Sequence, residues 1–195
     1  MNKEKMFEEI EAYFQHINYA YNTGVAYFAL RDNTVIENIA NKAPGFFTMA
    51  QYALSKTLFI ELAKMFCGSG EERTFRKLLN MVEGNCHLFT SPKTIKKLCE
   101  EARNLLDNTY SQTIANIKSR RDKDLTHNDP KYFSGKRNPA AENYISPEEA
   151  EKLCKFVAEF CNILLQYLDS SKTVVLTGGA NDIRDLLKEM KDSPK

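Results

Sequence analysis

Apolar residues recur every three or four positions along most of this 195-residue chain, and this period constrains it to helices. In the first segment the repeat runs from Phe7 to Phe28, and a later one runs from Ala150 to Leu168. The eight glycines and six prolines cluster where the period breaks, so they separate helices more than they interrupt them. The pattern predicts helices over residues 3–30, 34–41, 44–67, 71–82, 92 to about 121, 146–168 and 182–190.

Local signals mark several helix ends. Ser91 can cap a helix whose first turn holds Pro92, and residues 146–149 (Ser-Pro-Glu-Glu) are typical of a capping box. Pro130 cannot continue a helix, so residues 131–145 are expected to form a polar loop. Because the connections are short, the expected fold is all-α, an antiparallel up-and-down bundle of four to five main helices with a short extended C-terminal tail.

The chain changes character after residue 170. Residues 173–177 (Thr-Val-Val-Leu-Thr) are mostly β-branched and precede two glycines, which predicts a short strand without an obvious partner. We therefore expect a helical bundle over residues 1–170 and a C-terminal arm over residues 171–195, with a short strand and a helix.

The composition argues against several classes of protein. The net charge of +1 gives no global field that attracts nucleic acid, so any RNA binding needs a local basic patch. The five cysteines form no Cys-x-x-Cys pair, which is typical of reduced thiols in the cytosol. The three histidines are too scattered for a zinc site, and no apolar stretch is long enough to cross a membrane. We expect a cytoplasmic protein with no metal, cofactor or membrane segment.

The best candidate for chemistry lies at the end of the predicted helix that begins at residue 92. At about 100° per residue, Arg121 shares a face with Ile114 and Ile117, whereas Arg120 and His127 lie together on another flank. Asp122 points away if the helix stays regular. The apolar stripe therefore becomes polar over its last two turns, as at a bundle end open to water or at a pocket between two copies of the chain.

A bland interpretation stands beside the chemical one. Basic residues near a helix C-terminus interact favourably with the helix dipole, and His127 is explained equally well as a surface residue. The chemical interpretation needs Arg121 to bind a phosphate with two hydrogen bonds and His127 to act as an acid or base. It requires no metal.

An arginine, a polar residue and a histidine after four to six intervening residues, late in a helical bundle, resembles the motif of the HEPN family. Arg121, Asp122 and His127 fit this motif with five intervening residues, and Arg120 with His127 also fits, with six. We prefer Arg121 because a polar, non-basic residue follows it, although Asp122 stands where the family often has Asn. Residues 58–66, 75–79 and 121–129 are further similar to the abortive-infection type U branch of that family.

The resemblance implies a metal-independent RNA endonuclease of toxin or phage-defence type that acts as a homodimer with a composite site. His127 would move a proton, Arg121 would hold the scissile phosphate, and Asp122 would orient its neighbours. The products would be a 2′,3′-cyclic phosphate and a 5′-hydroxyl. Supporting contacts to RNA would come from the basic residues nearby, namely Lys118, Arg120, Lys123, Lys131 and Arg137.

Two other functions remain open at this stage. The first is a non-catalytic HEPN module. The resemblance implies it because some relatives bind nucleotides, or pair with a nucleotidyltransferase or antitoxin partner that silences them. The second is a structural adaptor that uses the segment from Thr173 to Met190 as its docking element.

Overall fold

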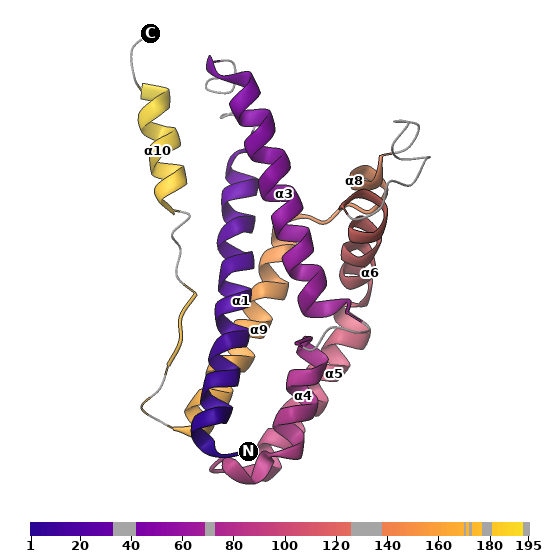
Figure 1. Ribbon diagram of the computed structural model, residues 1–195, viewed down its shortest axis with the longest axis vertical. Coiled ribbons are helices and arrows are strands. Elements are labelled where there is room, and N and C mark those ends of the chain that lie inside the picture. Colours follow the sequence, from indigo (N-terminus) through magenta and orange to yellow (C-terminus); the bar gives the residue numbers. More distant parts are fainter. Residues whose placement is uncertain are drawn as a thin grey trace.

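Three long helices form the frame of the protein: α1 (Lys3–Ala29), α3 (Pro44–Phe66) and α9 (Pro147–Leu168). They lie side by side in the computed structural model, with α1 between α10 and the other helices (Figure 1). The structure describes residues 1–32, 42–68, 73–125, 138–169, 171, 173–176 and 181–192, so the predicted helix over 34–41 lies outside the described residues. The all-α architecture is confirmed, and none of the described helices is both long and apolar enough to cross a bilayer.

The predicted apolar stripes of α1 and α9 form the centre of the core. Of the predicted residues, Ile10 and Ile17 of α1 and Leu153 and Val157 of α9 are fully buried, whereas Phe7 is half-buried and Met6 is buried in its place. Each such side chain stabilises the fold by roughly 1.5–3 kcal/mol relative to an exposed one. The predicted capping box begins α9, because the Ser146 hydroxyl accepts from the Glu149 backbone N–H and the Glu149 carboxylate accepts from the Ser146 N–H.

A second group of helices packs below and beside this frame. It contains α4 (Phe75–Gly84), the 3₁₀ turn η2 (Cys86–Leu88), α5 (Pro92–Asn104) and α6 (Ser111–Arg120). Phe75, fully buried at the start of α4, contacts the rings of Phe66, Phe156 and Phe160 edge to face, at centroid distances of 5.2–6.2 Å. Such contacts join α4 to both α3 and α9.

The single helix predicted from residue 92 to about residue 121 is interrupted. A π-helical turn, η3 (Leu105–Thr109), separates α5 from α6, and a second, η4 (Arg121–Leu125), follows α6. In η3 the Tyr110 N–H donates to the Leu105 carbonyl, five residues back, at 2.9 Å. Neither turn contains Gly or Pro, so the sequence carries no local signal for it. Each extra residue rotates the following side chains by about 100° relative to a regular helix.

Two predictions about segments outside the main helices are wrong. The expected polar loop contains a short helix, α8 (Pro139–Glu142), because Asn138 accepts from the Ala140 and Ala141 N–H groups and Pro139 fits a first turn. Residues 173–176, the described part of the expected strand, form no strand. The Val174 N–H instead donates to the Asn162 side chain at 3.3 Å, and the described part of the chain contains no strand that could pair with it.

The last helix, α10 (Asn181–Asp192), confirms the prediction for residues 182–190. It lies beside the upper part of α1 (Figure 1). Its Leu187 joins a small apolar cluster with Ala29, Leu30 and Phe47, which is separate from the main core.

Candidate functional site

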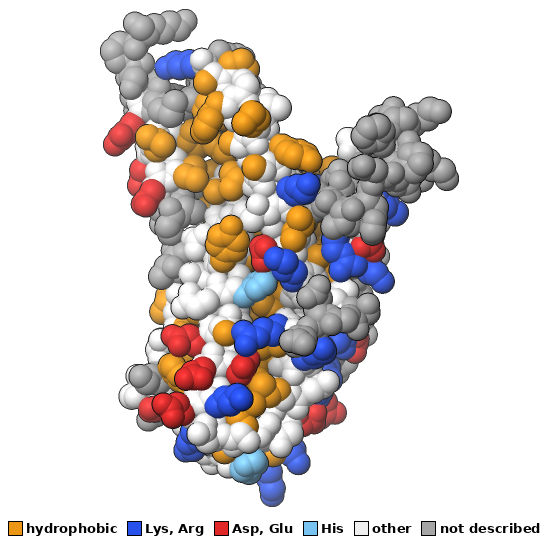
Figure 2. All heavy atoms as spheres, viewed as in Figure 1, with side chains coloured by type: hydrophobic (Ala, Val, Ile, Leu, Met, Phe, Trp, Pro, Cys, Tyr) orange, Lys and Arg blue, Asp and Glu red, His pale blue; other side chains and the backbone are white. Residues whose placement is uncertain are grey.

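The predicted site residues lie where α6 passes into η4, and this turn contacts α3. Lys118 is exposed, and Arg121, Asp122 and Lys123 are half-buried. Figure 2 shows Lys and Arg side chains gathered over this side of the molecule. The structure thus provides the local basic patch that a chain with almost no net charge needs to attract a polyanion.

Arg121 and Asp122 form a pair. The Arg121 Nε donates to Asp122 Oδ1 at 2.7 Å, and the arginine side chain is 26% exposed. The expectation that Asp122 points away applied only to a regular helix, and the helix is not regular here because the π-helical turn begins at Arg121. A guanidinium has five N–H donors in a fixed plane, so it can hold a carboxylate and a phosphate at once. Asp122 orients the guanidinium in this arrangement.

The Cys67 thiol lies at the end of α3, close to this pair. It donates to the Ile114 carbonyl at 3.6 Å. Burial raises the pKa of Cys67 to about 11, although the positive charges of Arg121 and Lys118 act to lower it. The thiol is therefore protonated at neutral pH and is a poor nucleophile.

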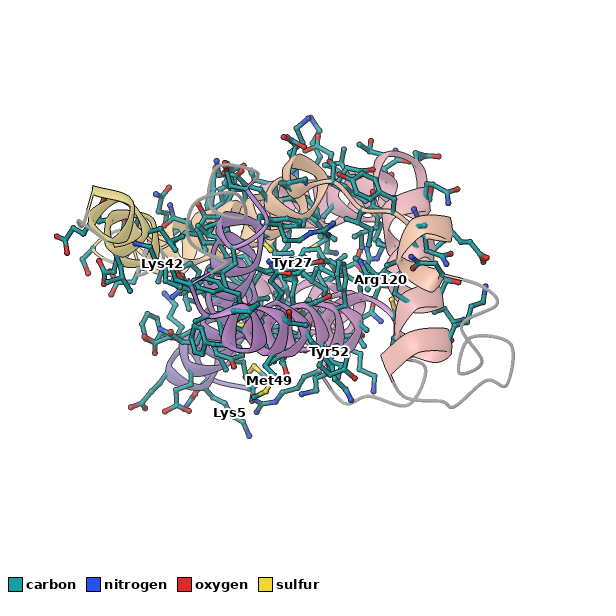
Figure 3. The ribbon with its side chains drawn as sticks, turned by 90° about the horizontal axis from the view of Figure 1, so that it is seen from above. Lys5, Tyr27, Lys42, Met49, Tyr52 and Arg120 are labelled. Carbon is teal, nitrogen blue, oxygen red and sulfur yellow. The ribbon has the colours of Figure 1, made fainter. Side chains whose placement is uncertain are left out.

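Arg120 has a different environment from its neighbour. It is 5% exposed and lies between α3 and α6 (Figure 3), with its guanidinium carbon 3.6 Å from the centroid of the Phe59 ring. Its Nη2 donates to the Ser55 hydroxyl at 3.3 Å. These contacts hold α6 against α3. Because Arg120 is buried, it is not placed to contact a polyanion at the surface, which favours Arg121 as the arginine of the motif.

The buried face of α6 is therefore shifted by one residue from the expectation. Thr113, Ile117 and Arg120 are buried, whereas Ile114 and Arg121 are half-buried. The period of a regular helix placed Arg120 on the flank with His127, and its burial is costly unless it is partnered. The partners Ser55 and Phe59 come from α3, and nothing local to residue 120 indicates them.

The remaining predicted residues, His127, Lys131 and Arg137, lie outside the described residues. Leu125, the last residue of η4, is the last described residue before His127. His16 pairs with Glu61, with Nε2 3.1 Å from Oε2, and His87 lies in η2. Within the described ranges, no three His, Cys, Asp or Glu side chains are grouped as metal ligands.

Comparison with known proteins adds one finding. Residues 4–191 match the family model HEPN_AbiU2, described as AbiU2. The match includes both the bundle and α10. No curated protein and no solved structure matches the chain.

Proposed function

Because the chain belongs to the HEPN family, in its AbiU2 branch, we propose that it is a metal-independent endoribonuclease of toxin or phage-defence type. One observation carries the proposal. Arg121, at the position of the motif arginine, is held in a partly exposed basic turn by Asp122. A guanidinium fixed in this way is suited to bind a phosphate and to neutralise charge that develops on it during the reaction.

The proposed reaction uses the ribose 2′-OH of the substrate as the nucleophile. The 2′-oxygen forms a bond to phosphorus, the bond from phosphorus to the 5′-oxygen breaks, and the products are a 2′,3′-cyclic phosphate and a 5′-hydroxyl. One proton leaves the 2′-OH and one is delivered to the 5′-oxygen. Histidine is the side chain best suited to both tasks near neutral pH, and two copies of His127 in a composite site divide them. DNA lacks the nucleophile, so only RNA is cleaved.

The proposed dimer is supported by an exposed apolar surface on α3. Phe46, Met49 and Tyr52 are 66%, 73% and 61% exposed, and Figure 2 shows apolar side chains over the upper part of this helix. In Figure 3 Met49 and Tyr52 lie on the outer side of α3, and Arg120 lies on the side that faces α6. Tyr52 is one turn from Ser55, which contacts Arg120, so a second copy docked here lies next to the proposed site.

We expect Tyr52→Glu to convert the dimer to a monomer and to lower RNA cleavage at least tenfold, because a carboxylate in an apolar interface loses its hydration. Light scattering coupled to size exclusion measures the mass. Tyr144→Glu is the matched control, since Tyr144 is equally exposed but lies between α8 and α9. A Tyr52→Glu protein that remains a fully active dimer would exclude this surface as the interface.

The proposed activity is tested by incubating the purified protein with total RNA in EDTA. We expect fragments that end in a 2′,3′-cyclic phosphate, which can be distinguished from a 3′-phosphate by enzymatic end-labelling. Unchanged RNA across ribosomal, transfer and messenger species would contradict the proposal.

The net charge of +1 favours one alternative, a non-catalytic HEPN module bound to a nucleotidyltransferase or antitoxin. In that case the apolar surface of α3 binds the partner instead of a second copy. A partner encoded beside this chain, co-expressed with it and recovered with it in a stable complex that binds but does not cleave RNA, would favour the alternative.

A further inference from the structure

A cleft lies where four segments meet: the end of α3, the start of α4, the turn η3 and the start of α6. It has a volume of about 220 Å³ and is open to solvent on one side. That volume is below the roughly 300–1,000 Å³ of sites for drug-sized molecules, so the cleft suits a smaller ligand. The residues that determine its chemistry are Phe66, Phe75, Arg76, Asp107, Ser111 and Ile114.

The cleft combines an aromatic floor with a polar mouth. Phe66 is half-buried, and its ring packs on Phe75, which is fixed in turn by Phe156 and Phe160. At the mouth, Arg76 of α4 pairs with Asp107 of η3, and both side chains are about half exposed. A flat aromatic ligand with hydrogen-bonding groups on its edge matches this arrangement, because it stacks on the floor and bonds to both members of the pair.

The turn η3 creates the mouth. The π-helical turn rotates the side chains of residues 105–109 relative to a regular helix. In a regular helix Asp107 would point in another direction and would not face Arg76 across the cleft. Turns of this type often occur at functional sites. The Ser111 hydroxyl donates to the Asn108 carbonyl, so it is fixed at the edge of the cleft and presents an acceptor oxygen there.

The cleft lies near the proposed catalytic turn. Ile114, which lines the cleft, is seven residues before Arg121, the first residue of η4, so the two are about 10 Å apart along the helix axis. The exposed Lys118 lies between them. Cys67 contacts Ile114 and lies near both Lys118 and Arg121. A single strand of RNA held at Arg121 therefore has a basic path along α6 that leads to the cleft.

We propose that this cleft binds a base of the RNA substrate, beside the phosphate held at Arg121, and so contributes to the choice of cleavage site. The inference rests on the proposed function for the identity of its ligand. Phe66 stacks on the base, and Arg76 and Asp107 supply a donor and an acceptor for the base edge. The two charged groups cancel, so the cleft distinguishes bases by hydrogen bonding and leaves phosphate binding to the turn.

The test uses the full-length His127→Ala protein, which holds RNA without cleaving it, and short fluorescent single-stranded RNAs that differ in base. We expect Phe66→Leu to weaken binding of the preferred RNA about tenfold, because leucine keeps the apolar volume and removes the stacking surface. We expect Arg76→Gln to reduce the difference in affinity between RNAs. RNA carrying 5-iodouridine should crosslink to Phe66 under ultraviolet light, and mass spectrometry locates the crosslink.

Matched controls separate recognition from folding and charge. Phe156→Leu changes the same aromatic cluster but does not line the cleft, and Arg103→Gln removes the ion pair between α4 and α5 with the same loss of charge as Arg76→Gln. Both controls should bind RNA as the parent does. If Phe66→Leu fails to fold, Arg76→Gln and the crosslink still decide the question, since Arg76 lies at the surface.

The outcomes distinguish this inference from the proposed function. Unchanged affinity and base preference in the folded cleft variants, with no crosslink in the cleft, would overturn the inference even if the parent protein cleaves RNA. A crosslink at Phe66 together with the expected loss of affinity would support it, even if the parent cleaves no RNA in EDTA and the proposed nuclease activity fails.

Discussion

Arg121→Ala is expected to lower the rate of RNA cleavage by about a hundred- to a thousandfold and to melt within a few degrees of the parent protein. The loss of rate follows because a fixed donor that binds the developing charge contributes an effect of this size. The stability is preserved because the Arg121 side chain is partly exposed and a partly exposed ion pair such as that with Asp122 contributes little. Single-turnover kinetics and melting by circular dichroism measure the two effects.

Two controls accompany this variant. Arg73→Ala removes a more exposed arginine, paired with Glu9, far along the chain from the motif, and should leave cleavage unchanged. His127→Ala should lower cleavage at least as much as Arg121→Ala does. His87→Ala, in η2, should leave cleavage unchanged. Full activity in Arg121→Ala would remove it from the mechanism, and a loss of many degrees would identify it as a structural residue.

Arg120→Ala should have the opposite pattern, with a large loss of stability. We expect the free energy of unfolding to fall by about 3 kcal/mol, because the variant loses a desolvated cation–π contact and a charged hydrogen bond and leaves a cavity between α3 and α6. For a chain of this length the melting temperature falls by roughly 10 °C. Urea denaturation followed by circular dichroism measures the free energy.

The conservative variant tests the physical reason. Arg120→Lys keeps the charge but has no planar group to lie over the Phe59 ring, so it should recover only part of the stability. Lys97→Ala, which removes an exposed ion pair with Glu101, should change stability by less than about 0.5 kcal/mol. Normal stability with lost cleavage in Arg120→Ala would transfer the catalytic assignment from Arg121 to Arg120.

The elements predicted correctly are those whose signals are local. The apolar stripes of α1 and α9 and the capping box at Ser146 each depend on residues within one or two turns, and the structure confirms them. The all-α bundle follows from these elements and from the short connections between them. The helix of the C-terminal arm was also predictable from the sequence, because its amphipathic pattern is local.

The errors concern features that depend on tertiary contacts. The two π-helical turns have no Gly or Pro signal, so a constant period placed Ile114, Arg120 and Arg121 at the wrong angle, although Ile117 is buried as predicted. The predicted strand at 173–177 had no obvious partner in the sequence, and its described residues, 173–176, pair with no strand among the described residues. Propensity alone cannot decide such cases, because the free energy of pairing comes from the neighbour.

In the candidate site, too, some features are visible in the sequence and others depend on the folded structure. The order Arg121, Asp122, His127 is visible in the sequence, but the bond between Arg121 and Asp122 depends on the local geometry of η4. The burial of Arg120 depends on Ser55 and Phe59, which are distant in sequence. The cleft combines residues of four segments, and no single segment contains its pattern.

Leu187 of α10 belongs to a small apolar cluster whose other buried members are Ala29, Leu30 and Phe47, and none of these four is among the buried residues of the main core. Half-buried Leu54 packs against both clusters. We expect the amide protons of α10 to exchange with solvent through a local opening that costs less free energy than global unfolding. Such an opening would expose the apolar face of α10 to another molecule while the other helices keep their native packing.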